Sequence, residues 1–272
     1  MPGHDPIPPD LVACLLAVGN SRCRVAALAD GGVQHATAHP SGDAGGVAQA
    51  IRGVLDDHAG APLVVASVHR PALDAVLDAL GEGSVEAVIA GEDFGLPIQT
   101  TVREPERIGI DRLLCSLAAF RMADQACIVA DAGTAITVDF VDGLGTHHGG
   151  AICPGIAAML EGLARAAPTL PALSASDALA SATGDADPWG ADSREAMALG
   201  VRHAAVGLVH TLVDRFAQAY GGYPRVIATG GDAAALFGED DIVEHVVPDL
   251  QLAGLAQAYA AALARADDAD DE

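Results

Sequence analysis

Residues 126–141 read ACIVADAGTAITVDFV, and this stretch decides the fold of the chain. Two apolar segments, 126–130 and 136–141, flank the residues Asp131-Ala132-Gly133-Thr134-Ala135. Short apolar runs on both sides of a glycine-containing turn are typical of two buried strands joined by a tight connection. The stretch therefore predicts a strand, a turn and a second strand.

A segment of the same kind lies near the start of the chain. Here the residues between two apolar runs are Ala17-Val18-Gly19-Asn20-Ser21, and they can be laid over Asp131 to Ala135. An internal duplication is the simplest explanation of two such segments in one chain. We expect an α/β protein with an N-terminal domain over 1–107 and a related C-terminal domain over 108–272.

The remaining apolar patterns alternate between the helical and the strand period, as expected of α/β units. Helices are predicted at 47–57, 71–80, 111–122, 192–220 and 252–265, and further strands at 33–38, 63–68, 85–90, 149–153 and 225–228.

Composition excludes several classes of protein. The 272 residues are 51% hydrophobic, and 14 arginines face 37 acidic residues, with no lysine at all and a net charge of −23. Such a chain is globular rather than disordered, and its field repels nucleic acid. The five cysteines contain no C-x-x-C pair, which argues against a disulfide framework or a zinc ribbon.

No signal for export or membrane insertion is expected. The first ten residues are rich in proline and acid and lack a basic region, and nowhere do 18 apolar residues run uninterrupted. We therefore expect a cytoplasmic protein that contacts neither a membrane nor nucleic acid.

Three glycine turns are candidates for nucleotide binding. The turns at Gly19 and Gly133, one in each half, could bring backbone amides against phosphates, because glycine has no Cβ to block the approach. A third, Thr229-Gly230-Gly231-Asp232, follows a buried strand and precedes an alanine-rich helix that Asp232 could cap. Ordinary hairpin and strand-to-helix turns are the alternative interpretation of all three.

Four motifs in this order resemble the type III pantothenate kinases of the actin-like ATPase superfamily. They are Gly109-Ile110-Asp111-Arg112, Asp131 to Ala135, Gly149-Gly150-Ala151-Ile152-Cys153-Pro154-Gly155 and Ala228-Thr229-Gly230-Gly231. The resemblance implies two duplicated actin-like (ribonuclease H-like) α/β domains around a nucleotide cleft. It also implies a homodimer and ATP-dependent phosphorylation of pantothenate to 4′-phosphopantothenate, the first step of coenzyme A biosynthesis.

The resemblance also assigns roles to single residues. Asp111 matches the general base, although it could merely cap its helix. Ser193 stands where the family has a pantothenate-binding threonine, and could equally be a helix N-cap. Val102 stands where the family has a tyrosine that contacts pantothenate. The other implied contacts are Gly109, Ile110 and Arg112 for pantothenate; Gly19, Asn20, Ser21, Gly133, Thr134, Gly230 and Gly231 for ATP; and Asp131 for a monovalent cation, K⁺ or NH₄⁺.

One departure concerns the metal. Ala17 replaces an aspartate that helps to hold Mg²⁺ in the superfamily. The chain could be a divergent kinase in which Asp131, Asp139 or water covers the metal. It could also be a homologue that binds nucleotide or pantothenate without turnover, or a kinase for another small alcohol.

Overall fold

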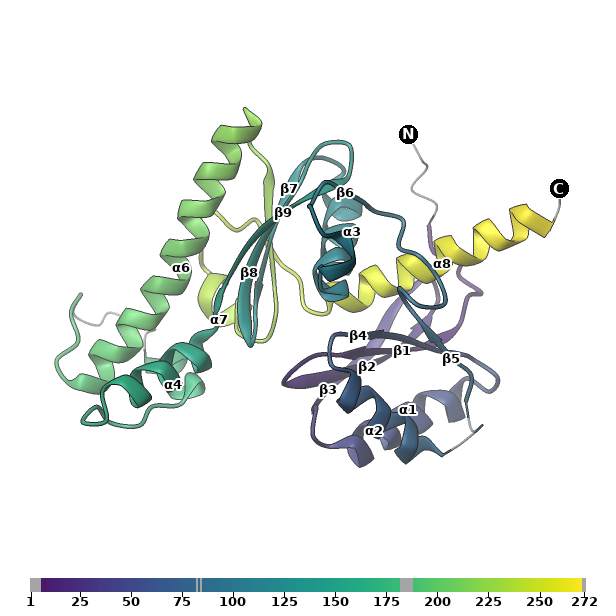
Figure 1. Ribbon diagram of the computed structural model, residues 1–272, viewed down its shortest axis with the longest axis horizontal. Helices are drawn as coiled ribbons and strands as arrows, with labels where there is room; N and C mark the ends of the chain where they lie inside the picture. Colours follow the sequence, from purple (N-terminus) through teal and green to yellow (C-terminus); the bar gives the residue numbers. More distant parts are fainter. Residues whose placement is uncertain (1–5, 82, 84, 182–187, 271–272) are drawn as a thin grey trace. The chain divides into compact units, whose positions relative to one another are not determined.

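The computed structural model describes residues 6–81, 83, 85–181 and 188–270 (Figure 1). The chain forms two compact units, Met1–Met122 with Asp249–Glu272, and Ala123–Pro248. Each unit is built on its own mixed β-sheet, and the two are described separately.

The sheet of the first unit has the order β3-β2-β1-β4-β5. Its strand β1 is antiparallel to β2 and parallel to β4, so the sheet changes direction at its centre. The strands are β1 Ala13–Val18, β2 Arg22–Ala29, β3 Gly32–Pro40, β4 Leu63–Ser67 and β5 Ala87–Ile89, and β6 (Gln99–Thr100) follows.

Helices cover both faces of this sheet because its central strands, β1, β2 and β4, are apolar on both sides (Figure 1). Alternate residues of β1 face opposite ways: Leu16 packs with Ile51 and Leu73, whereas Leu15 packs with Leu114 and Leu255. The helices are α1 Ala44–Asp57 and α2 Arg70–Leu80 on one face, and α3 Ile110–Ala123 and α8 Leu250–Asp270 on the other; a 3₁₀ turn, η1, spans Pro105–Arg107.

Five strands of the second sheet, in the order β11-β10-β7-β8-β9, repeat this arrangement. Central β7 is antiparallel to β8 and parallel to β10, as β1 is to β2 and β4. The predicted internal duplication is therefore confirmed by topology. The strands are β7 Cys127–Ala132, β8 Ala135–Val141, β9 Thr146–Pro154, β10 Arg225–Thr229 and β11 His245–Val246.

Helices of the second unit pack on one face of its sheet. Ile128 and Val138 of the sheet share an apolar core with Val201 and Val209 of the long helix. The helices are α4 Ile156–Ala166, α5 Ala175–Ser181, α6 Ser193–Tyr220 and α7 Ala233–Phe237.

Helix α6 is long and apolar enough to cross a membrane, with a mean hydropathy of 1.4 over 18 residues, of which 33% are buried. The core helix of a soluble protein passes the same test. Because Met197, Val201, Ala205 and Val209 are buried in the core of the second unit, the packing favours a core helix.

The division of the chain differs from the expected domains 1–107 and 108–272. Both α3 and α8 were expected in the second domain, but both belong to the first unit. Their residues Leu114, Leu117, Leu252 and Leu255 are buried with Ala13, Leu15 and Val64 of the first sheet. The chain thus returns to its first sheet at its end, which a division in chain order does not anticipate.

Candidate functional site

In the first unit, the turn after β1 lies at the edge where two parallel strands end. Val18 of β1 pairs with Ser67 of β4, so the carboxyl ends of both strands meet there, the usual ligand-binding edge of an α/β sheet. The Gly19 amide donates to the Arg22 carbonyl at 2.9 Å, and Ser41 Oγ donates to the Gly19 carbonyl at 2.8 Å. The turn is fixed, and the side chains of Asn20 and Ser21 are exposed.

Ala17 lies inside the core instead of at a ligand surface. Its side chain is 1% exposed and packs in the same apolar cluster as Leu15 and Ala66. Nearby, Arg24 of β2 forms an ion pair with Asp249, the residue before α8. The backbone of Asp249 has a φ of 61°.

The motif at 109–112 starts helix α3. Asp111 Oδ1 accepts a hydrogen bond from the Arg112 amide at 2.9 Å, and the same amide also donates to the Gly109 carbonyl at 3.1 Å. Asp111 Oδ1 lies so close over Gly109 that a Cβ there would overlap with it. A Cβ on Gly109 would also stand 3.8 Å from Val68 Cγ1, so this motif lies against the segment that follows β4.

Ile110 and Val102 complete the predicted acceptor residues of the first unit. Ile110 is half-buried, and its Cδ1 packs against Gly91. Val102 is half-buried in the loop between β6 and η1, where its amide donates to Thr100 Oγ1 at 3.3 Å.

In the second unit, the structure brings two predicted nucleotide turns together around Asp131. Its Oδ1 would overlap with a Cβ on Gly230 and would lie 3.7 Å from a Cβ on Gly133. The Asp232 amide donates to the Ala132 carbonyl at 3.0 Å, which ties the Gly230-Gly231 turn to the end of β7. A half-buried carboxylate thus lies between the two glycine turns.

The glycines of these turns serve different purposes. Gly230 has φ of 99°, and a Cβ there would collide with the Ala132 carbonyl, so the fold itself requires glycine. At Gly133 no atom would lie closer than 3.7 Å to an added Cβ. The space over Gly133, beside exposed Thr134, is therefore an open cradle that a methyl group would fill. Without that methyl group, the cradle fits the close approach of a phosphate.

Gly155 and Ser41 support the turns, and the sequence pattern does not single out either residue. A Cβ on Gly155 would overlap with the carbonyls of Gly133 and Thr134, and the Gly155 amide donates to the Thr134 carbonyl at 3.1 Å. The glycine-rich motif ending at 155 was a usable signal for the first. Ser41 supports its turn from 20 or more residues away, and no local pattern marks it.

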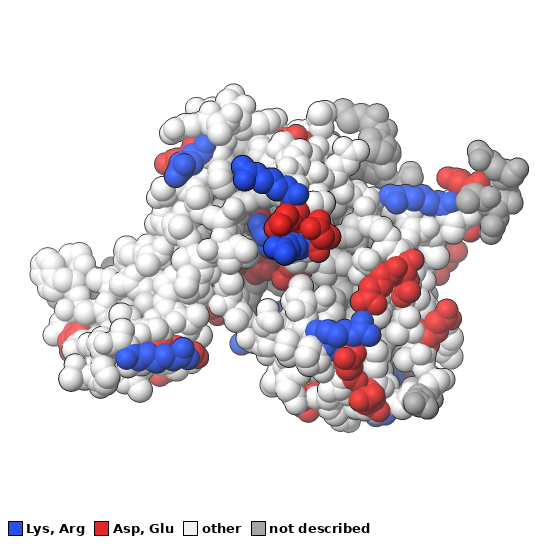
Figure 2. Space-filling view, in the orientation of Figure 1, with Lys and Arg blue, Asp and Glu red and all other residues white. Residues whose placement is uncertain are grey.

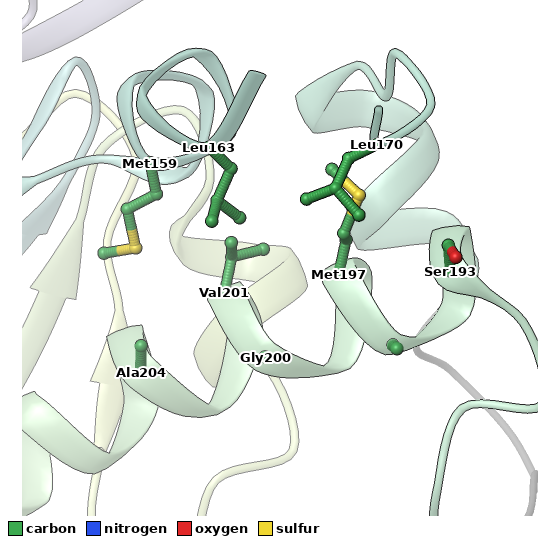
Figure 3. Close-up of a pocket in the computed structure, with 9 residues that line it drawn as sticks. Met159, Leu163, Leu170, Ser193, Met197, Gly200, Val201 and Ala204 are labelled. Atoms are coloured by element: carbon green, nitrogen blue, oxygen red, sulfur yellow. The ribbon is translucent and has the colours of Figure 1, made fainter. Parts of the chain in front are cut away.

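Ser193 lies apart from these turns, as the first residue of α6. The N-cap is Asp192, whose Oδ1 accepts from the amides of Arg194 and Glu195 at 2.8 and 2.9 Å, so the suggestion that Ser193 caps the helix is wrong. Ser193 lines one end of a groove of about 510 Å³ between α4 and α6 (Figure 3). The other lining residues are Met159, Leu163, Leu170, Ala196, Met197, Gly200, Val201 and Ala204.

The side chains offer few ligands for a metal ion. Among the residues that the structure describes, no three His, Cys, Asp or Glu side chains are grouped closely enough to hold one. Asp139 is 2% exposed, and its Oδ1 lies 3.8 Å from His147 Nε2. On the visible surface, arginines and acidic residues lie beside one another in small groups (Figure 2). A divalent ion would need phosphate oxygens and water to complete its shell.

Comparison with solved structures establishes the fold. The activator of 2-hydroxyisocaproyl-CoA dehydratase from Clostridium difficile, solved with bound ADPNP, matches 96% of this chain and 97% of its own with a TM-score of 0.54 and 14% identity. An archaeal actin homolog matches 91% and 99% with a TM-score of 0.51 and 12% identity. The protein has the actin-like ATPase fold.

Comparison with known sequences identifies the family. A type III pantothenate kinase from Rhodopirellula baltica is 39% identical over 189 residues, 66% of each chain, and one from Caulobacter vibrioides is 34% identical over 65% and 66%. The matches thus span slightly less than two thirds of these relatives. The family model for type III pantothenate kinases matches residues 14–215. This chain therefore belongs to the type III pantothenate kinase family.

Proposed function

We propose that the protein transfers the γ-phosphoryl group of ATP to the hydroxyl of pantothenate, giving 4′-phosphopantothenate and ADP. The observation that carries the proposal is Asp111, a carboxylate held over Gly109 at the ligand-binding edge of the first sheet. Membership of a kinase family supports it.

Asp111 acts as the general base in this proposal. Oδ1 is engaged by the Arg112 amide, which fixes the carboxyl group. The carboxylate takes the proton of the acceptor hydroxyl while the oxygen attacks the γ-phosphorus, and the bond from that phosphorus to the bridging oxygen of ADP breaks. Gly109, Ile110, Arg112, Val102 and Ser193 are the proposed acceptor-binding residues.

The nucleotide is proposed to bind at the glycine turns. Gly133 offers an open cradle, and Thr134 and Gly231 beside it are exposed. Gly230, and Gly19, Asn20 and Ser21 of the first unit, are the other proposed ATP contacts. Backbone amides suit this chain, because it has no lysine to bind phosphate.

The proposed ions differ in the ligands that the protein supplies. Mg²⁺ would enter with ATP and be held mainly by phosphate oxygens and water, neutralising charge on the phosphates. Asp131 is the proposed ligand of K⁺ or NH₄⁺, because its carboxylate lies between the two turns of the second unit.

Two alternatives stay open on specific grounds. The burial of Ala17 favours a homologue that binds its ligands without turnover, since no carboxylate is available at that position. A kinase for another small alcohol would use the same base and differ only in its acceptor residues, such as Val102.

A coupled ADP-release assay tests the function. With ATP, Mg²⁺ and K⁺ or NH₄⁺, we expect ADP release that depends on pantothenate. ATP binding without pantothenate-dependent release, at any concentration of either cation, would favour the binding homologue. Release that depends on other small alcohols would identify the second alternative.

We also propose a cytoplasmic homodimer that binds neither nucleic acid nor membranes. Helix α6 has only 33% of its most apolar window buried, and the apolar groove beside it has one polar lining side chain, Ser193. An apolar helix of this kind needs a second partner surface. Light scattering that gave the mass of one chain at micromolar concentration would contradict the dimer.

A further inference from the structure

His69 occupies the ligand-binding edge of the first sheet. It is the second residue after β4 and the N-cap residue of α2. Its amide donates to Ser67 Oγ at 3.2 Å, and the amide of Val68 donates to the Val18 carbonyl at 3.0 Å. The segment 67–69 is thereby fixed beside the turn that follows β1.

The ring of His69 carries a polar atom that the protein leaves unsatisfied. Nδ1 is buried and has no hydrogen-bond partner among the described residues. The ring makes no cap hydrogen bond to the helix, and only the His69 carbonyl accepts from the Ala72 and Leu73 amides, at 3.1 Å each. A buried nitrogen without a partner costs about 1–3 kcal/mol, so its presence needs an explanation.

The neighbours of His69 indicate which ligand would satisfy this atom. A Cβ on Gly109 would stand 3.8 Å from Cγ1 of Val68, the residue before His69, and the Asp111 carboxylate is held over the same glycine. The following residue, Arg70, is turned to Asp74 and Glu92 at 2.8 and 3.0 Å. His69 therefore adjoins the proposed acceptor site, whereas the guanidinium group of Arg70 is already paired with two surface carboxylates.

We propose that His69 is an additional acceptor-binding residue, whose Nδ1–H donates a hydrogen bond to a carboxylate or hydroxyl oxygen of the small alcohol that is phosphorylated. The proposal rests on the proposed function. A neutral imidazole can donate from Nδ1, and a ligand oxygen would relieve the cost of burying that nitrogen.

Three substitutions at His69 distinguish the role of Nδ1 from that of Nε2. His69→Asn keeps a polar atom near the place of Nδ1, His69→Gln keeps one near Nε2, and His69→Val keeps neither. We expect the KM for pantothenate to rise about five- to tenfold in the Gln and Val variants, the worth of one hydrogen bond, and less in Asn. The KM for ATP should not change, and His58→Val, at the end of α1, should match the wild type.

Stability distinguishes ligand binding from a structural role. Without ligand, His69→Val should melt at the wild-type temperature or higher, because it removes an unsatisfied buried nitrogen. Equal pantothenate KM values in the wild type and all three variants would overturn the proposal. So would a Val variant that melts lower while its pantothenate KM stays the same.

Nitrogen NMR of the wild-type protein with ¹⁵N-labelled histidine keeps the inference separate from the activity. Pantothenate, ATP and inorganic phosphate are added in turn, and His69→Gln identifies the resonance. A shift of the Nδ1 signal with pantothenate supports the inference even if the ADP-release assay is negative and the proposed turnover fails. No shift with any of the three, or a shift only with ATP or phosphate, overturns it.

Discussion

Ala17 of β1 and Arg24 of β2 stand directly opposite each other in the antiparallel pairing of the two strands, so both side chains project from one face of the sheet. Opposite residues of this kind have Cβ atoms about 4.5–5.5 Å apart. Arg24 is bound by Asp249, which comes from the far end of the chain. The carboxylate missing at residue 17 would therefore face an arginine that another acid already occupies.

Ala17→Asp should for this reason be tolerated better than a buried charge without a partner. We expect a loss of unfolding free energy of about 1–3 kcal/mol, because Arg24 can pair with the new carboxylate. If the turn after β1 still approaches the phosphates, the variant should also show a higher kcat or a stronger dependence of activity on Mg²⁺. Urea unfolding and a Mg²⁺ titration of activity measure the two effects.

A double-mutant cycle with Asp249→Asn identifies the partner of the new carboxylate. Asp249→Asn should cost less stability in the Ala17→Asp background than alone, with a coupling energy of at least about 0.5 kcal/mol. Strictly additive effects would mean that the introduced carboxylate and Asp249 do not share Arg24.

Asp111→Asn tests the general base. Asparagine keeps an oxygen for the Arg112 amide, so the start of α3 and the melting temperature should be unchanged. Without a base, kcat should fall about 10²- to 10⁴-fold, with little change in the KM for ATP. Turnover at the wild-type rate would remove Asp111 from its proposed role.

Gly133→Ala and Gly230→Ala form a matched pair in the second unit. The Gly133 variant should keep its stability, because no atom lies within 3.7 Å of the new methyl group, but bind ATP more weakly, because that methyl group fills the cradle. The Gly230 variant should lose about 2 kcal/mol or more, from the collision with Ala132 and a φ of 99°. Calorimetry measures unfolding and ATP binding of both variants. Equal stability and equal ATP affinity in the two would contradict the assignment of Gly133 to ATP binding and of Gly230 to the fold.

Asp240 should make stability depend on pH in acid. Burial opposes its ionisation, but the amides of Ile242 and Val243 and the ring of His210 together hold its pKa below the ordinary value. A depressed carboxyl pKa stabilises the fold fully above about pH 4, and this contribution disappears as pH falls through the lowered pKa. Asp240→Asn should thus cost about 1–3 kcal/mol at neutral pH, and the difference from the wild type should shrink in acid.

The exposed neighbour Asp241 provides the control for this titration. Asp241→Asn should follow the wild-type curve of unfolding free energy against pH. A constant difference between Asp240→Asn and the wild type from pH 7 to pH 3 would show that the Asp240 charge does not contribute.

The sequence by itself determined the local elements and the duplication. Apolar runs on both sides of Gly19 and Gly133 were sufficient, because a strand buried on both faces needs apolar residues at nearly every position, and a tight turn needs glycine or small polar residues. The strands on both sides of each turn lie where they were expected, with β1 and β7 ending directly before the glycine. The motifs at 109–112 and 228–231 likewise predicted the family that comparison establishes.

Tertiary structure alone decided which residues share a site and which sheet each helix covers. Helix α8 is apolar around its first half, so its sequence cannot say that Leu252 and Leu255 pack on the first sheet. The reason for each glycine was equally hidden, since Gly133 leaves open space whereas Gly230 avoids the Ala132 carbonyl. Three relationships join residues 22 or more positions apart: the proximity of Val68 to Gly109, the support of Gly19 by Ser41 and the pairing of Arg24 with Asp249. Such contacts depend on how strands and helices pack, and a local pattern carries no information about them.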